Sequence, residues 1–148
     1  MTKMKTNSSI IVLITMLWIS LASCGEKQNE KSADQNSASA ISLISPEELN
    51  KANNDILLID VRTPAEYASG HVENSVNIDF RASNFKNLIG ELDKNQDVYV
   101  YCKVGGRSAG AAKLMEDMGF KKIYDLKGGI IQWEKDGFKK VKQNNNYE

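Results

Sequence analysis

The chain has 148 residues, which is the length of one domain and enough for an ordinary hydrophobic core. Hydrophobic residues make up 41% of it and charged residues 26%, a composition typical of soluble globular proteins. Its 19 basic and 19 acidic residues balance, so the sequence offers no electrostatic basis for binding nucleic acid.

The N-terminal segment has the pattern of a signal peptide. Lys3 and Lys5 precede the apolar run 10–21, which is shorter than the roughly 20 residues of a membrane span. The run ends in Leu-Ala-Ser before Cys24, a sequence that resembles a bacterial lipobox. We therefore expect residues 1–23 to be a lipoprotein signal peptide, cleaved before Cys24, which then carries lipid and anchors the protein to a membrane. An uncleaved membrane anchor and an ordinary signal peptide are the alternatives.

This N-terminal prediction leaves one thiol in the mature protein. With Cys24 lipidated, Cys102 is the remaining cysteine, so no internal disulfide forms even though a compartment outside the cytoplasm permits one. One histidine and one free cysteine are too few for a zinc site built by the protein alone, and no metal or organic cofactor is expected. Loss of Lys3 and Lys5 leaves 17 basic residues against 19 acidic ones, a formal charge of −2. Residues 24–40 are polar, small and without periodicity, which predicts a flexible tether.

Strand-like and helix-like segments alternate from residue 41 to residue 140. Ser, Pro and Glu at positions 45, 46 and 48 predict a helix N-terminus, and the same pattern recurs at 63–66 in a short helix that Gly70 closes. The continuous apolar run 56–60 predicts a strand buried on both faces of a parallel sheet. In chain order, the further predictions are a strand at 75–78, a helix at 85–92, a strand at 97–101, a helix at 108–118, a strand at 123–126 and a helix at 130–135.

Such alternation predicts an α/β fold with an open parallel sheet and helices on both faces. In these folds ligands bind beyond the carboxyl ends of the strands, which is where Cys102 falls at the end of a central strand. Residues 141–148, which include three consecutive asparagines, are expected to fray as a C-terminal tail.

The most informative segment is the loop Cys102-Lys103-Val104-Gly105-Gly106-Arg107, which follows the strand 97–101 and precedes the helix. A loop that leads from a strand into a helix N-terminus points several backbone N–H groups inward, and with the helix dipole these form an anion site. A thiol placed there ionises readily, and the thiolate is the nucleophile. A buried structural cysteine is the alternative, and the adjacent glycines and helix start argue against it. We therefore predict that Cys102 is a catalytic nucleophile.

Three segments in order resemble the rhodanese-like sulfurtransferase family over residues 41–140. They are Asp60-Val61-Arg62 with Glu66-Tyr67 and Gly70-His71-Val72, then the Cys102 loop, then Leu126-Lys127-Gly128-Gly129 with Trp133. The resemblance implies the rhodanese-like fold and a cysteine that accepts a sulfane sulfur as a persulfide and passes it on. It implies a small anionic donor such as thiosulfate, and a thiol, cyanide or protein cysteine as acceptor.

The length of the loop separates sulfur transfer from phosphoryl transfer. Four residues lie between Cys102 and Arg107, whereas cysteine phosphatases, including the cell-cycle phosphatases that share the rhodanese fold, have five. One residue fewer contracts the ring of amides, which favours a sulfur-sized group over a tetrahedral phosphate. The loop length therefore favours a sulfurtransferase over a phosphatase.

The other loop residues have two interpretations each. Arg107 lies at a helix start, where the dipole disfavours a cation, so we expect it either to bind substrate or to support the loop. Lys103 either attracts an anionic donor or is simply solvated. Val104, Gly105 and Gly106 complete the loop, and the two glycines allow positive φ and close approach of an anion.

Residues outside the loop are predicted to have supporting roles. Ser108 is expected to cap the helix rather than to contact the sulfur. Asp60 and Arg62 end a strand at the same sheet edge as the cysteine; by the resemblance Asp60 braces the loop, and an ion pair or helix cap of the fold is the equal alternative. By the same resemblance His71 is structural rather than a general base, and Trp133 is core or pocket wall.

Together these patterns predict a lipid-anchored, single-domain sulfurtransferase of the bacterial cell envelope, on its periplasmic or extracellular side. Cys102 carries the persulfide, which the loop amides and Arg107 stabilise. The alternative outside catalysis is a persulfide carrier or sensor that docks to a membrane partner. A cysteine phosphatase or arsenate reductase is the less favoured enzyme.

Overall fold

The computed structural model describes residues 39–52 and 56–142. The predicted signal peptide 1–23, the lipidation site Cys24 and the tether as far as residue 38 lie outside these residues, as does the tail from residue 143. Within the described ranges, no helix is long and apolar enough to cross a bilayer.

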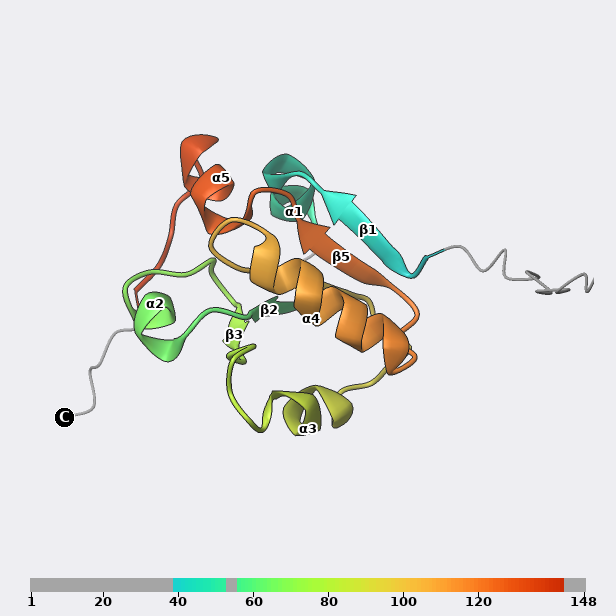
Figure 1. Cartoon of the computed structure of the whole chain (residues 1–148). Coiled ribbons are helices and arrows are strands. Elements are labelled where there is room, and N and C mark those ends of the chain that lie inside the picture. The colour runs from blue at the N-terminus through green and yellow to red at the C-terminus, as the bar shows by residue number, and fades with distance from the viewer. Residues whose placement is uncertain (1–38, 53–55, 143–148) are drawn as a thin grey trace, which may run out of the picture. The chain divides into compact units, whose positions relative to one another are not determined.

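Five strands form one sheet in which every pairing is parallel (Figure 1). Their order across the sheet is β1-β5-β4-β2-β3, so β4 lies at the centre and its carboxyl end leads into the cysteine loop. This arrangement confirms the predicted α/β fold with a parallel sheet. The strands are β1 (Ile41–Ile44), β2 (Leu57–Asp60), β3 (Val76–Asn77), β4 (Val98–Tyr101) and β5 (Ile123–Leu126).

Helices cover both faces of the sheet (Figure 1). On one face α3 (Phe85–Gly90) and α4 (Gly106–Asp117) bury side chains such as Ile89 and Met115 against Val98 and Val100. On the other face α1 (Pro46–Lys51) and α5 (Gly129–Lys135) pack against Leu58 and Tyr101. Because successive strand residues point to opposite faces, both faces of β4 are buried, which explains its continuous run of apolar and aromatic residues.

Both predicted capping boxes are present. The Ser45 hydroxyl accepts the N–H of Glu48 at the start of α1, and the Glu48 carboxylate accepts the N–H of Ser45 in return. Thr63 and Glu66 form the same reciprocal pair at the start of α2 (Pro64–Ala68). These local patterns therefore set the first residue of each helix, as the sequence predicted.

Several boundaries differ from the predictions, and long-range pairing is the reason. Strand β1 was not predicted, because its segment is half exposed and its partner β5 is distant in sequence. Val141, which lies just past the predicted domain end at residue 140, exchanges two 2.9 Å backbone hydrogen bonds with His71. That pairing ties the end of the domain to the segment that follows α2.

Candidate active site

Cys102 lies directly beyond the last residue of the central strand β4, and three residues separate it from the first residue of α4. Its side chain shares the α4 face of the sheet with Val98 and Val100, as the two-residue period of a strand requires. The residue exposes 1% of its surface, while Lys103 and Val104 beside it are exposed. The thiol is therefore enclosed by its loop, and the loop itself faces solvent.

Hydrogen-bond donors of the loop converge on the sulfur. The backbone N–H of Gly105 donates to Cys102 Sγ at 3.1 Å, and the hydroxyl of Ser108 lies 3.6 Å from the same atom. Gly105 has a φ of 108°, a left-handed conformation that favours glycine and that ends the loop at the N-cap of α4. The glycine therefore lets the chain turn back over the sulfur with its N–H pointing inward.

These donors favour the thiolate form of Cys102. Burial by itself raises the pKa of the thiol, because an apolar environment disfavours the charged form. Hydrogen bonds from the backbone N–H and hydroxyl of Ser108, and from the N–H groups of Gly105 and Val104, outweigh this effect and hold the pKa below its ordinary value. The site thus provides a buried thiol that ionises more easily than a free cysteine, which is the property of a nucleophile.

Arg107 is held by a carboxylate. Its guanidinium donates two hydrogen bonds to Glu66 of α2, of 2.7 and 2.8 Å, in the bidentate geometry typical of arginine. Hydrogen bonding to Arg107 lowers the pKa of Glu66 to about 2, and the same bond raises the pKa of Arg107. These bonds tie the start of α4 to α2, and both predicted roles of Arg107, substrate binding and support of the loop, stay predictions.

The N-terminus of α5 supports the loop from the other side. The N–H groups of Ile130 and Ile131 donate to the carbonyl oxygens of Cys102 and Lys103, at 2.9 and 3.2 Å. Gly129 lies so close that a Cβ built on it would be 2.5 Å from the carbonyl oxygen of Cys102. Close backbone contact is the reason that position 129 requires glycine.

Comparisons with known proteins agree with this geometry. The rhodanese-like domain family matches residues 45–136, which is more than half of the chain. The chain belongs to the rhodanese-like domain family. A sulfurtransferase of Allochromatium vinosum is 35% identical over 83 residues, covering 56% of this chain and 76% of that protein.

Other relatives show how widely the rhodanese-like domain is used. The crystal structure of a rhodanese-related protein from Thermoplasma volcanium matches with a TM-score of 0.60 and 31% identity, over 66% of this chain and 95% of that one. A tRNA uridine(34) hydroxylase of Pelagibacter ubique is 37% identical over 102 residues, 66% of this chain, but the chain spans only 33% of that protein. The relatives thus support rhodanese-type sulfurtransferase chemistry at the level of the family.

Unlike Ser108, the predicted supporting residues Asp60, Arg62 and His71 of this rhodanese-like domain make their described contacts with groups other than the Cys102 sulfur. Asp60 and Arg62 form a buried ion pair of 2.6 Å, and Arg62 also donates to the carbonyl oxygen of Gly70 at 2.8 Å. Arg62 donates to both oxygens of the Asp60 carboxylate through its backbone N–H and its guanidinium. His71 stacks on Tyr67, with ring centroids 3.8 Å apart. These contacts are those of side chains that hold the fold together.

One buried acid of the rhodanese-like domain was missed by sequence reasoning. Asp125 of β5 exposes 3% of its surface, and its Oδ1 atom has no hydrogen-bond partner within residues 39–52 and 56–142. Burial raises the pKa of its carboxyl group, and the neighbouring Ser108 hydroxyl lowers it by a smaller amount. A lone acid inside the apolar run 123–126 is the sequence signal that could have identified it.

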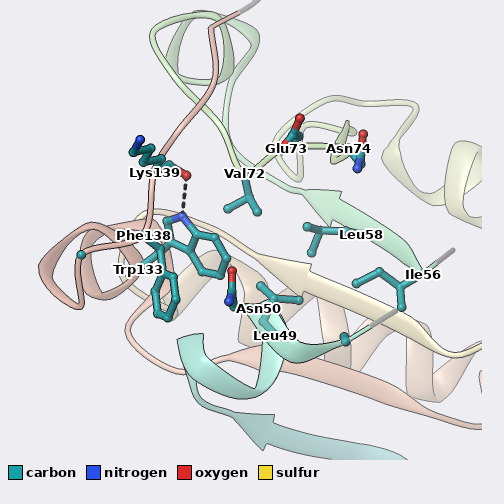
Figure 2. Close-up of a pocket in the computed structure, with 12 residues that line it drawn as sticks. Leu49, Asn50, Ile56, Leu58, Val72, Glu73, Asn74, Trp133, Phe138 and Lys139 are labelled. Carbon is teal, nitrogen blue, oxygen red and sulfur yellow. Dashed lines mark hydrogen bonds between the residues drawn. The ribbon is translucent and has the colours of Figure 1, made fainter. Parts of the chain in front are cut away.

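A cavity of about 400 Å³ lies elsewhere in the rhodanese-like domain, and the cysteine is not among its lining residues. Figure 2 shows Trp133 and Phe138 on one side of it and Leu49, Leu58 and Val72 around the rest. The indole N–H of Trp133 donates to the Lys139 carbonyl oxygen at 2.9 Å, the bond drawn dashed in Figure 2. Trp133 therefore belongs to the hydrophobic core and also lines this cavity. Within the described part of the chain, no group of three or more metal-ligating side chains comes together.

Proposed function

We propose that this rhodanese-like domain transfers a sulfane sulfur through a persulfide on Cys102. One observation carries the proposal: the sulfur of Cys102 lies beneath converging donors, with the Gly105 N–H at 3.1 Å, and its pKa is lowered despite burial. A site built to stabilise an anionic sulfur stabilises a thiolate and a persulfide alike.

The proposed reaction has two steps, loading of Cys102 with sulfur and transfer of that sulfur to an acceptor. The Cys102 thiolate attacks the outer sulfur of thiosulfate, a new S–S bond forms, and sulfite leaves with the electron pair of the old S–S bond. An acceptor such as cyanide or a thiolate then attacks the outer sulfur of the persulfide. The electron pair of that S–S bond returns to Cys102 as a thiolate, and the loop N–H groups stabilise the negative charge in both steps.

Two features support a small anionic donor. The four-residue loop forms a narrow ring of amides, which fits a terminal sulfur better than a tetrahedral phosphate. Lys103 is exposed beside the cysteine, where its charge attracts an anion approaching from solvent. A thiol, a protein cysteine or cyanide is the proposed acceptor.

The N-terminal sequence supports a second part of the proposal, attachment to a membrane of the bacterial envelope. Lys3, Lys5, the apolar run 10–21 and Cys24 have the pattern of a lipoprotein signal, so the proposed location is the periplasmic or extracellular side. Labelling of the chain with a radioactive fatty acid in a bacterial host tests this. Incorporation that disappears in Cys24→Ser supports the anchor, and equal labelling of both chains refutes it.

The activity is tested with the detergent-solubilised full chain carrying Cys24→Ser, in which Cys102 is the one remaining cysteine. Thiosulfate:cyanide turnover is measured for this chain and for its Cys102→Ser derivative, and intact mass is recorded after incubation with thiosulfate. We expect turnover and the mass of one added sulfur atom, both lost in Cys102→Ser. Sulfur loading without multiple turnover would identify a carrier, and neither loading nor turnover would refute persulfide chemistry.

A further inference from the structure

Two exposed apolar side chains lie beside each other at the cysteine loop. Val104, inside the loop, exposes 64% of its surface, and Ile131, in the first turn of α5, exposes 45%. The N–H of Ile131 donates at 3.2 Å to the carbonyl oxygen of Lys103, which belongs to the peptide group that joins Lys103 to Val104. This hydrogen bond holds the two apolar residues next to each other, and we call Val104 and Ile131 the apolar rim.

The other large apolar side chains that the described residues expose belong to three separate elements. Leu43 and Val76 lie on the outer strands β1 and β3, and Leu88 lies on α3. Single exposed apolar side chains are common on soluble proteins and need no partner to explain them. Two of them side by side at a reactive cysteine indicate instead a surface that a reactant covers.

The apolar rim offers nothing to a small hydrated anion. The charge of Lys103 attracts thiosulfate or cyanide, but neither anion carries apolar groups that would remove Val104 and Ile131 from water. Cys102 exposes 1% of its surface, so an acceptor has to approach it across the loop that covers it. The groups on either side of an acceptor thiol then meet the side chains at that loop.

The charges beside the apolar rim are basic. Lys103 directly precedes Val104, and Lys127 lies two residues before Gly129, which is in close contact with the backbone of Lys103. Both lysines are exposed, and neither takes part in an ion pair among the described residues. A partner that carries acidic residues next to its apolar ones therefore complements this surface.

We propose that the acceptor of the Cys102 persulfide is a protein cysteine flanked by apolar and acidic residues, and that this partner docks on the apolar rim. The inference rests on the proposed persulfide chemistry of Cys102. The partner's thiolate attacks the outer sulfur of the persulfide and forms a new S–S bond. The electron pair of the old S–S bond returns to Cys102 as a thiolate, and the partner leaves with the sulfur as its own persulfide.

The test uses the full chain carrying Cys24→Ser, loaded with sulfur from thiosulfate and then freed of the donor. Intact mass follows the transfer of sulfur to three short peptides that have a cysteine at the centre. The first peptide has leucine on both sides of the cysteine and glutamate at both ends; the second has serine in place of leucine, and the third has lysine in place of glutamate. Rates are compared per thiolate, from the thiol pKa of each peptide. We expect the first peptide to react about five- to tenfold faster than the second and about threefold faster than the third.

Substitutions of the apolar rim should remove the preference for leucine. Val104→Ser and Ile131→Ser should each reduce it to about two- to threefold, because half of the rim is lost. Val76→Ser is the matched control: it makes the same change at a valine of β3 that exposes 52% of its surface, and it should keep the full preference. The preference is a ratio of two rates in one variant, so a general loss of activity does not alter it.

Several outcomes would overturn the inference. The leucine and serine peptides could react equally fast with the parent chain, or the preference could persist in both Val104→Ser and Ile131→Ser. Mercaptoethanol that reacts, per thiolate, as fast as the leucine peptide would identify a small acceptor. Sedimentation that shows a dimer of the parent chain but not of Ile131→Ser would assign the rim to a second copy.

The mass measured after loading separates this inference from the proposed function. A chain that gains no sulfur from thiosulfate refutes persulfide chemistry, and the docking of an acceptor is refuted with it. A chain that gains the sulfur but does not distinguish the peptides refutes the docking surface alone.

Discussion

Arg107 at the start of α4 and Glu66 in the first turn of α2 are joined by two hydrogen bonds of 2.7 and 2.8 Å, across 41 positions of sequence. The same Glu66 carboxylate accepts the N–H and the hydroxyl of Thr63, at 3.1 and 3.0 Å, in the capping box of α2. One side chain therefore connects the beginnings of two helices. Because Arg107 is the last residue of the cysteine loop, this connection also fixes the end of the loop.

The Glu66–Arg107 pair predicts acid sensitivity. Hydrogen bonding to Arg107 holds the pKa of Glu66 at about 2, below its ordinary value of 4.5. A lowered carboxyl pKa stabilises the fold above the unfolded pKa, and the stabilisation is lost as pH falls from 4.5 toward 2. Both side chains are partly exposed, so we expect the pair to contribute about 1 kcal/mol to the free energy of unfolding. Urea denaturation at about pH 6 and about pH 3 should show Glu66→Gln losing less stability than the native chain does. Equal losses would contradict this.

Substitutions of Glu66 and of Arg107 are predicted to change the KM for the sulfur donor in opposite directions. In Glu66→Gln the guanidinium loses its counter-charge, so the field at the loop becomes more positive and the KM for thiosulfate should fall about threefold. Arg107→Met leaves the carboxylate uncompensated and should raise that KM. Glu134→Gln, which breaks the Lys140–Glu134 pair, is the control and should leave it unchanged. A rise in both site variants would mean that the pair acts only by holding the loop.

Gly129→Ala is predicted to damage both fold and activity. Its Cβ would lie 2.5 Å from the Cys102 carbonyl oxygen and 2.8 Å from the Lys103 carbonyl group, and the φ of 58° adds backbone strain. We expect a loss of about 2–4 kcal/mol in the free energy of unfolding, and lower turnover because the loop must move. Gly119→Ala is the matched control: its φ is 92° and nothing lies within 4 Å, so about 1 kcal/mol of strain and normal turnover are expected. Thermal unfolding and turnover measure both effects, and similar losses in the two variants would contradict the close-contact argument.

Asp60→Asn is predicted to destabilise the protein without altering its chemistry. Removing one partner of the buried 2.6 Å pair leaves Arg62 uncompensated, which costs about 3 kcal/mol. Asp97→Asn, in the exposed 3.4 Å pair with Lys122, should cost less than about 0.5 kcal/mol. Urea denaturation measures the cost, and turnover per folded molecule should stay within about twofold because the Asp60 carboxylate bonds Arg62 and not the loop. A large fall in turnover would show instead that Asp60 braces the loop.

Local patterns explain what the sequence could predict. Ser45 and Thr63 form capping boxes with residues three positions later, so propensity and structure coincide there. The cysteine loop is equally local: its donors are Gly105 and Ser108, both within six residues of the sulfur. The fold, and the place of Cys102 in a loop between a strand and a helix, were therefore predictable from local sequence patterns.

What the sequence did not predict depends on contacts between distant segments. Neither the partner of Arg107 nor the alignment of Asp125 with Val100 follows from any short pattern, because strand register is set by the assembled sheet. The expectation that Ser108 caps the helix rather than contacts the sulfur was wrong for a related reason. The hydroxyl caps nothing, since Gly105 occupies the N-cap, and burial against the sheet turns it toward Cys102.

The pairing of β1 with β5 also sets the order in which the molecule can assemble. Among the strands of the described residues, the first to leave the ribosome pairs with the last one alone, from Ile41 against Ile123 to Ile44 against Leu126. Bringing β1 and β5 together costs the conformational entropy of the long segment between them before any contact between the two strands forms, and this slows folding. A nascent chain that ends before Ile123 lacks β5, the strand with which β1 pairs. β1 can therefore join the sheet only when synthesis of the domain is almost complete.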